Sequence, residues 1–257
     1  MSNALRIQAA TGLDRGDRDY QQDQLCLLPH ARINGCLLGV VADGMGGRSG
    51  GRKASDQVML TAKQLFERYD PGTDKPQEFL GNLVNEAHLV IRLTATAAEE
   101  EPHSTVAAFL LNPEGDCHWV HAGDSRIYHF RNGKLQHRTQ DHSLVQMLVE
   151  RGELSEQEAQ HDARSNILMG CLGSDKAPPQ TFHTIQKMQA GDVLLACSDG
   201  LWHYFLTEEI GKTVALLTPQ EACPFLIQKA KQRAEGSGDN ISVILVKWET
   251  RSETQAA

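Results

Sequence analysis

The sequence predicts an α+β fold, because segments typical of strands and segments typical of helices come in separate blocks. Apolar strand patterns come first, two long helical patterns follow them, and further strand patterns come later. In a βαβ architecture a helix would follow each strand, and the chain does not show that alternation. The order of the blocks therefore favours an α+β domain over a parallel α/β one.

Eight segments have the continuous or alternating apolar character of β-strands. They are residues 5–10, 24–28, 36–42, 105–111, 117–121, 125–130, 193–196 and 241–248. Asn132-Gly133 separates IYHF from KLQHR, and both residue types tolerate a positive φ. A tight hairpin turn is therefore expected at this point.

Two helical patterns fill the gap between the early and the middle strands. Apolar residues recur at helical spacing first at 54–66 and then at 79–91. Pro71, Gly72 and Pro76 separate the two patterns. A third helix is expected at 219–234, directly before the last strand.

A single domain at 1–250 accounts for the length of the chain, and a short disordered tail is expected at 251–257. Residues 143–179 differ from the rest of the domain because they are polar, contain several glycines and end in Pro178-Pro179. We expect short helices and loop that project from the domain here, and we call this segment the flap.

The bulk composition excludes several classes of function. The formal net charge of −8 argues against nucleic-acid binding through a general positive field. No apolar stretch approaches the roughly 20 residues that span a bilayer, and no signal-peptide pattern opens the chain. The six cysteines are widely spread without a CxxC pair, as in a reducing compartment. We therefore expect a cytoplasmic protein with no nucleic-acid and no membrane partner. We also expect the chain to be a monomer.

Acidic residues beside glycine or asparagine are the most informative local feature. Asp43 in GVVADGMGG, Asp199 in VLLACSDG and Asp239 in GSGDNISVILV are each expected just after an apolar strand. Asp124 in WVHAGDSRIY ends one expected strand just before the next, and Asp23 lies early, in RDYQQDQLCLL. Taken singly, each is explained as a turn residue. Together they predict a shared acidic rim, and hard divalent cations prefer clustered carboxylates, carbonyl oxygens and water.

The motifs RGDRDYQQD, VVADGMGG, HAGDSRIY, DHS, CSDG and GDNISVILV follow one another along the chain. In this order they resemble the metal-dependent type 2C protein phosphatases, the PPM family, and particularly its compact bacterial members. The resemblance runs from about Gly12 to Trp248. It implies an antiparallel β-sandwich flanked by pairs of antiparallel helices, which agrees with the α+β pattern.

The resemblance also implies a metal centre of two Mn²⁺ or Mg²⁺ ions. Asp43 would bridge the two ions, and the carbonyl of Gly44 would bind one of them. Asp199 and Asp239 would hold the second ion. Asp124 resembles the ligand of a weaker third ion in bacterial members.

Three further residues match catalytic positions of the family. Arg18 would grip the substrate phosphate, because a guanidinium fork matches the phosphate oxygens. Asp23 would orient metal-bound water, and Asn240 would help to position Asp239 or a bound water.

The implied activity is hydrolysis of phosphoserine and phosphothreonine by direct attack of a hydroxide bound to the two ions. The implied partners are phosphorylated proteins, namely the substrates of a partner Ser/Thr kinase in bacterial signalling and the kinase itself. An alternative is a catalytically weak phosphoprotein-binding regulatory module with the same fold. The intact Arg18, Asp43, Asp199 and Asp239 argue against that alternative.

The chain departs from the family pattern at a few positions. Met45 stands where many eukaryotic members have a histidine that is a candidate general acid, and a thioether cannot donate a proton. Gln21-Gln22 replaces the usual Asn-Glu, which would lower metal affinity if Gln22 takes the place of the acidic residue. His103-Ser104-Thr105 replaces the usual Gly-Thr-Thr.

Cys26 and Arg32 have the spacing of cysteine-dependent phosphatases, which leaves a thiol enzyme as a third hypothesis. That chemistry needs free backbone N–H groups around the phosphate, and here Pro29 removes one and Cys26 falls in a strand pattern. Chance spacing is therefore favoured. For His142 in DHS, a structural role at the start of the next helix competes with a catalytic one.

Overall fold

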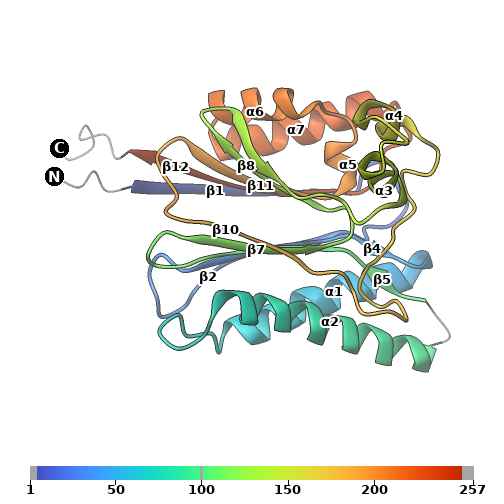
Figure 1. Ribbon diagram of the computed structural model, residues 1–257, viewed down its shortest axis with the longest axis horizontal. Helices are drawn as coiled ribbons and strands as arrows, with labels where there is room; N and C mark the ends of the chain where they lie inside the picture. The colour runs from blue at the N-terminus through green and yellow to red at the C-terminus, as the bar shows by residue number, and fades with distance from the viewer. Residues whose placement is uncertain (1–4, 99–100, 251–257) are drawn as a thin grey trace.

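Two antiparallel sheets of five strands each pack face to face at the centre of the molecule (Figure 1). The computed structural model describes residues 5–98 and 101–250, and the tail predicted at 251–257 lies outside the described residues. The first sheet has the order β1-β12-β11-β8-β9. Its strands are β1 (Leu5–Asp14), β12 (Ile241–Thr250), β11 (Asp192–Cys197), β8 (Arg126–Arg131) and β9 (Lys134–Arg138).

The second sheet has the order β10-β7-β6-β3-β2. Its strands are β10 (Thr181–Ile185), β7 (Cys117–Ala122), β6 (Val106–Leu111), β3 (Leu37–Ala42) and β2 (Gln24–Pro29). A separate short pair, β4 (Gly44–Met45) and β5 (His103–Ser104), lies at one end of this sheet.

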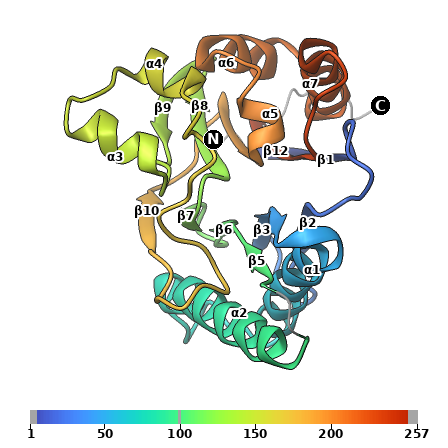
Figure 2. The ribbon, with the colours of Figure 1, turned by 90° about the vertical axis from the view of Figure 1, so that its right-hand side faces the viewer.

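Helices cover the outer face of each sheet, so the molecule is built in four layers (Figures 1 and 2). The second sheet is covered by α1 (Gly47–Phe66) and α2 (Pro76–Ala98), and the first by α5 (Asp199–Trp202), α6 (Thr207–Leu216) and α7 (Pro219–Ala234). The flap contains α3 (Leu144–Glu150) and α4 (Glu156–His161). None of the helices at 5–98 or 101–250 combines the length and the apolar character that crossing a bilayer requires.

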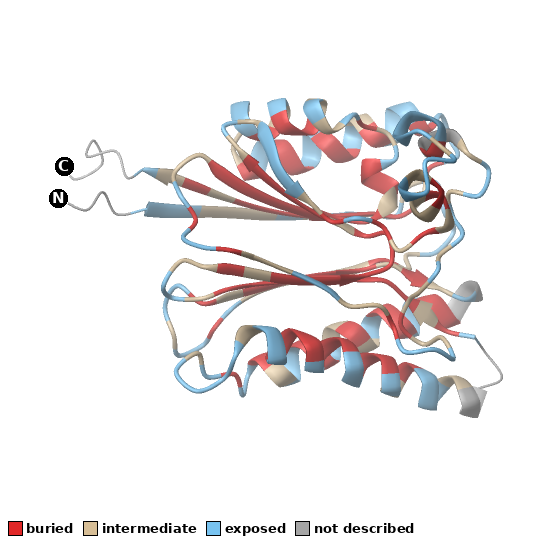
Figure 3. Cartoon of the chain, viewed as in Figure 1, coloured by how far each residue is buried: buried red, intermediate tan, exposed pale blue. Residues whose placement is uncertain are grey.

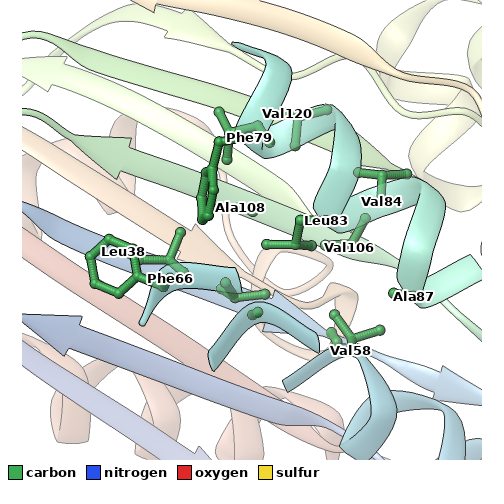
Figure 4. Packing of buried hydrophobic residues seen from close by; sticks show 14 of the residues in the cluster. Leu38, Val58, Phe66, Phe79, Leu83, Val84, Ala87, Val106, Ala108 and Val120 are labelled. Carbon is green, nitrogen blue, oxygen red and sulfur yellow. The ribbon is translucent and has the colours of Figure 1, made fainter. Parts of the chain in front are cut away.

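Central strands are buried on both faces, which explains why they read as continuous apolar runs. In β6, Val106 and Ala108 face α1 and α2, whereas the intervening Ala107 and Phe109 face the other sheet. Figure 3 shows this buried band along both sheets and along the inner faces of the helices. Figure 4 shows the layer below the second sheet, where Leu83 of α2 packs with Val106 in one cluster.

The predicted α+β fold and the sandwich flanked by helix pairs are confirmed. Each predicted strand is present with ends that differ by a few residues, and the predicted helices correspond to α1, α2 and α7. The hairpin turn is confirmed as well, since Asn132 and Gly133 have φ values of 49° and 77° between β8 and β9. The strand β10 and the helix α6 were not predicted.

Candidate functional site

Strand register brings the predicted site carboxylates to one end of the sandwich. In the second sheet Asp43 directly follows β3 and Asp23 directly precedes β2. The two strands pair with Gln24 opposite Ala42, so these aspartates lie side by side. The chain termini lie at the opposite end of the molecule (Figure 1).

The first sheet supplies two carboxylates at the same end. Asp199 comes two residues after the end of β11, and Asp239 two residues before the start of β12. Cys197 pairs with Val243, which places both aspartates at the same end of these two strands. Our expectation that Asp239 follows an apolar strand is therefore wrong. It precedes a strand, and the antiparallel direction of β12 brings it to the same end.

Asp124 lies where the chain crosses from one sheet to the other, between β7 and β8. Its backbone carbonyl accepts a hydrogen bond of 2.9 Å from the indole N–H of Trp202. Asp124 is buried. Figure 2 looks onto this end of the molecule, with α5 and β12 above β3 and the flap helices α3 and α4 at the upper left.

The pKa values of these carboxylates are raised in part by one another, so the groups lie close enough to interact. Burial raises the pKa of Asp43 well above its usual range, and the neighbouring carboxylates, chiefly that of Asp23, raise it further. Burial and then the charge of Asp239 raise the pKa of Asp199 to about 6. The pKa of Asp124 is also raised by burial and by the charge of Asp199. A cation placed among these groups would relieve this repulsion.

The residues at this end fit divalent cations. The donors are carboxylate oxygens, the set that Mg²⁺ and Mn²⁺ prefer. Oδ1 of Asp199 is buried without a hydrogen-bond partner, so it is free to accept a cation. Among the described residues, however, no group of three His, Cys, Asp or Glu side chains already converges as metal ligands. Asp239 instead forms an ion pair with Arg18, 2.6 Å from Nη2 to Oδ2.

Gly44 is the predicted carbonyl ligand, and its loop is packed backbone against backbone. A Cβ on Gly44 would overlap the carbonyl of Gly51, and a Cβ on Gly51 would overlap the carbonyl of Gly44. Only glycine therefore fits at these two positions. The backbone of the loop directly after Asp43 is therefore held close to the backbone of Gly51.

Arg18 is the predicted phosphate-binding residue, and it lies at the rim with its side chain 59% exposed. Its loop is attached to the loop before β12 through backbone contacts. Asp17 N–H donates to the carbonyl of Gly238, and Gly238 N–H donates to the Asp17 carboxylate. Gly16 has φ +62°, and a Cβ there would overlap the carbonyl of Asp239. Arg18 can therefore reach an anion bound beside the carboxylates.

The side chain of Asn240 forms hydrogen bonds with backbone groups of the loop that precedes β2. Its Nδ2 donates to the carbonyls of Arg15 and Tyr20, at 2.8 and 3.0 Å, and its Oδ1 accepts from Gln22 N–H at 2.6 Å. The side chain is buried, and it fixes the course of the loop that carries Arg18. Asn240 also donates its own N–H to the Asp239 carboxylate at 2.7 Å.

Asp23 is buried and held by hydroxyl groups. Ser198 Oγ donates to its Oδ2 at 2.6 Å, and Ser242 N–H donates to Ser198 Oγ at 3.0 Å. Burial raises the pKa of Asp23 to about 7, and the charges of Asp199 and Asp239 act in the same direction against these hydrogen bonds. A carboxylate with a pKa near neutrality can exchange a proton with water at physiological pH.

Asp43 is held by the segment that departs from the family pattern. Its N–H donates to Thr105 Oγ1 at 3.0 Å, and its carbonyl accepts from Ser104 Oγ at 3.1 Å and from Thr105 N–H at 2.9 Å. Thr105 Oγ1 also lies 2.6 Å from Ser125 Oγ, next to Asp124. The altered His103-Ser104-Thr105 therefore keeps the hydroxyls that fix Asp43.

Sequence reasoning missed these hydroxyl residues: Ser104, Thr105, Ser125, Ser198 and Ser242. A signal was available, because buried hydroxyls beside apolar strand ends need partners. Their partners, however, come from distant parts of the chain, and spacing alone does not identify them.

Cys26 and His142 are the two remaining candidates for a catalytic role. Cys26 lies within β2, and burial raises the pKa of its thiol to about 12, so it is unsuited to be a thiolate nucleophile. His142 accepts a hydrogen bond from Gly123 N–H at 3.2 Å, and its Nε2 lies 3.0 Å from Thr181 Oγ1. Both ring nitrogens of His142 are engaged within the fold, which supports its structural role.

Comparison with known proteins gives consistent matches. The family model described as protein phosphatase 2C matches residues 15–224. The serine/threonine phosphatase stp of Listeria monocytogenes is 31% identical over 212 residues, which cover 80% of this chain and 82% of that protein. The serine/threonine protein phosphatase PstP of Mycobacterium tuberculosis is also 31% identical, over 82% of this chain and 40% of its own length.

Solved structures of similar proteins share the fold. The M. tuberculosis phosphatase PstP/Ppp superposes with a TM-score of 0.82 at 28% identity, over 95% of this chain and 99% of the other. A structure of the catalytic domain of PstP in complex with two manganese ions has a TM-score of 0.79 at 28% identity, over 96% of this chain and 100% of the other.

Proposed function

This chain belongs to the protein phosphatase 2C family and is a serine/threonine phosphatase of the bacterial type, and we propose that it hydrolyses phosphoserine and phosphothreonine in proteins. The reaction would use two divalent cations held by Asp43, Gly44, Asp199 and Asp239. The family is metal dependent, and the PstP catalytic domain has been seen with two manganese ions. One observation supports the proposal above all others. Buried and half-buried carboxylates from both sheets meet at one rim, next to an exposed arginine.

Divalent cations bound at this rim would supply positive charge for the phosphoryl oxygens and lower the pKa of a water molecule. The chain contributes the arrangement. Arg18 binds the phosphate oxygens through its guanidinium group, and Asp23 orients the attacking water and accepts its proton. Asn240 holds the loop of Arg18 in place.

Protonation of the leaving serine or threonine oxygen needs a donor other than Met45, because a thioether has no proton to give. We propose that a water molecule at the rim supplies this proton, because an in-line displacement places the leaving oxygen on the side of the phosphorus opposite to Asp23 and the attacking water.

Further parts of the proposal concern ions, partners and location. Asp124 is proposed to hold a weaker third ion, and the flap to contribute to selection among phosphorylated proteins. We propose that the enzyme opposes a Ser/Thr kinase whose substrates, and the kinase itself, are its phosphoprotein partners. We further propose a cytoplasmic monomer that has no nucleic-acid or membrane partner.

The alternative is a phosphoprotein-binding module with little turnover. One observation favours it, namely the ion pair between Arg18 and Asp239, which engages a phosphate-binding and a metal-binding residue at once. Both side chains are partly exposed, and exposed pairs of this kind are worth only about 0–1 kcal/mol, so a cation or a phosphate can displace either partner.

The test is hydrolysis of a phosphothreonine peptide by the full chain with Mn²⁺, with EDTA and with Asp199→Asn. Turnover should require Mn²⁺ and should fall by several orders of magnitude with EDTA and in the variant. The control is Glu78→Gln, which breaks an exposed pair between Glu78 on α2 and Lys75, and it should keep full activity. Turnover that survives EDTA would contradict the metal-dependent mechanism, and no turnover with any divalent ion would favour the binding module.

A further inference from the structure

A buried ion pair joins the entrance of the flap to the strand that follows Asp124. Arg126, the first residue of β8, binds Asp141 through two hydrogen bonds, Nε to Oδ1 at 2.8 Å and Nη2 to Oδ2 at 2.7 Å. The side chains of Arg126 and Asp141 are only 14% and 7% exposed. Asp141 lies two residues before the flap begins. The pair is therefore shielded from solvent at the point where the flap leaves the domain.

The same arginine rests on an aromatic ring that contacts Asp124. The Arg126 guanidinium carbon lies 3.4 Å from the ring centroid of Trp202. The indole N–H of Trp202 donates to the carbonyl of Asp124 at 2.9 Å. Trp202 is the last residue of α5, and the first residue of that helix is Asp199. A short chain of contacts thus runs from the flap to two of the proposed metal ligands.

The exit of the flap is attached to another proposed ligand. Leu172 and Ser104 exchange two backbone hydrogen bonds, of 3.1 and 2.8 Å, and Ser104 Oγ donates to the carbonyl of Asp43. Both ends of the flap are therefore connected to the acidic rim through hydrogen bonds or ring contacts.

Packing beneath the flap is incomplete at the entrance. A cavity of about 190 Å³ lies between α3 and the segment after α5, and its lining includes Arg126, Asp141, Val145 and Trp202. Apolar packing is not complete here, so the ion pair is one of the contacts that hold the flap entrance, together with the hydrogen bonds between His142 and Gly123.

We propose that Arg126 is a positioning residue that couples the flap to Asp124 through Trp202, so that release of the flap entrance and displacement of Asp124 occur together. The proposal rests on the proposed function only in taking Asp124 as a ligand of the weaker ion. Coupling of this kind is reciprocal. A phosphoprotein that engages the flap changes the affinity for the ion at Asp124, and that ion in turn stabilises the attached flap.

Two variants separate the links of this chain of contacts. Asp141→Asn breaks the ion pair at the flap. Trp202→Phe keeps an aromatic ring under Arg126 and removes only the N–H donor to Asp124. The matched control is Asp192→Asn, which breaks the bidentate Arg131–Asp192 pair at the other end of β8, away from the rim.

Two measurements need no turnover. Trypsin cleavage after the exposed Arg151 and Arg164 in EDTA reports detachment of the flap. Titration calorimetry with Mn²⁺ measures the affinity of the weaker ion site. Asp141→Asn should increase flap cleavage several-fold and weaken the weaker Mn²⁺ site about tenfold, as changes around metal ligands commonly do. Trp202→Phe should weaken that site similarly and leave flap cleavage unchanged.

In kinetics with a phosphothreonine protein, both variants should raise the Mn²⁺ concentration needed for full kcat, and only Asp141→Asn should also raise KM. Asp192→Asn should lower Tm without a selective effect on flap cleavage or on Mn²⁺ binding. The proposal is overturned if Asp141→Asn loosens the flap while Mn²⁺ binding stays as in the wild type, or if Asp192→Asn matches it in both readouts. If the wild type binds Mn²⁺ but hydrolyses no phosphopeptide, the proposed function fails and the coupling is still measurable.

Discussion

A single amide, that of Asn240, determines the course of the loop that carries the phosphate-binding arginine. Asn240→Asp keeps the acceptor for Gln22 N–H but turns an oxygen toward the carbonyls of Arg15 and Tyr20. We expect a loss of about 1–3 kcal/mol in the free energy of unfolding, because buried polar groups lose their partners. We also expect kcat/KM for a phosphothreonine peptide to fall at least about tenfold, since the loop of Arg18 shifts.

Urea denaturation and steady-state kinetics check both effects. Asn85→Asp is the matched control, because the exposed Asn85 on α2 accepts one hydrogen bond from Gln180 and has no connection to the rim. Equal effects of the two variants would contradict the role given to Asn240.

Gln22 is neutral, whereas the usual family pattern has a negatively charged glutamate in the Asn-Glu pair that Gln21-Gln22 replaces. A Cβ on Gly51 would overlap Nε2 of Gln22, so the side chain lies against the loop that follows Asp43. Gln22→Glu brings a negative charge to this loop and should strengthen the attraction for a cation at the rim. We expect the Mn²⁺ concentration for half-maximal activity to fall several-fold.

A Mn²⁺ titration of activity, repeated as calorimetry without substrate, measures this change. Gln77→Glu is the control, because it adds the same charge at the exposed start of α2, away from the rim. An unchanged metal requirement in Gln22→Glu would show that the missing charge does not matter.

At the scale of elements, the strand β8 is fixed at its far end by an ion pair with a marked pH dependence. Burial raises the pKa of Asp192, but contacts with His129 and Arg131 and a hydrogen bond from Gln189 N–H outweigh it and lower the pKa to about 2. A lowered carboxyl pKa stabilises the fold above the ordinary value of 3.8, and that contribution is lost as the pH falls toward about 2.

Asp192→Asn should therefore lower the free energy of unfolding at neutral pH by about 2 kcal/mol. The difference from the wild type should shrink between pH 4 and pH 2. Urea denaturation at a series of pH values measures it. Asp14→Asn, in the partly exposed pair with Lys231, should cost at most about 1 kcal/mol. A difference that persists at low pH would mean that packing, and not charge, explains the loss.

Elements buried on both faces or on one long stripe were predictable from the sequence, and elements at the margins were not. The continuous run of β6 and the stripes of α1 and α2 follow from burial against two neighbours. β10 is an edge strand with exposed Thr181 and Phe182, so it lacks a strand pattern. α6 contains Gly211, which reads as a helix breaker. A Cβ there would overlap the carbonyl of Gly133, so the hairpin turn requires this glycine.

The carboxylates of the site could be anticipated because each stands at a recognisable strand end, but their surroundings could not. Asp23 depends on Ser198, which is 175 residues away in the chain. The carbonyl of Asp124 depends on Trp202, 78 residues away. Such partners are fixed by the register of distant strands, and no local pattern records that register.

At the scale of the whole molecule, the acidic rim lowers the stability of the metal-free protein. The raised pKa values of Asp43, Asp23 and Asp199 mean that the fold favours their neutral forms. Stability is therefore fully present below the ordinary carboxyl value of 3.8 and is lost as the pH rises through about 6 to 7. Proteins often keep such strain where function needs it.

Asp43→Asn removes the charge that the other carboxylates repel, so in EDTA at pH 8 it should raise Tm by a few degrees while abolishing turnover. Each kcal/mol shifts Tm by roughly 2–4 °C in a chain of this size. With Mn²⁺ the order should reverse, because bound ions stabilise only the wild-type rim. Calorimetric melting at pH 5.5 and 8, with EDTA and with Mn²⁺, measures both effects, and Asp192→Asn should lower Tm in every condition. A variant Asp43→Asn that melts below the wild type in EDTA would show that these carboxylates stabilise the fold even without a cation.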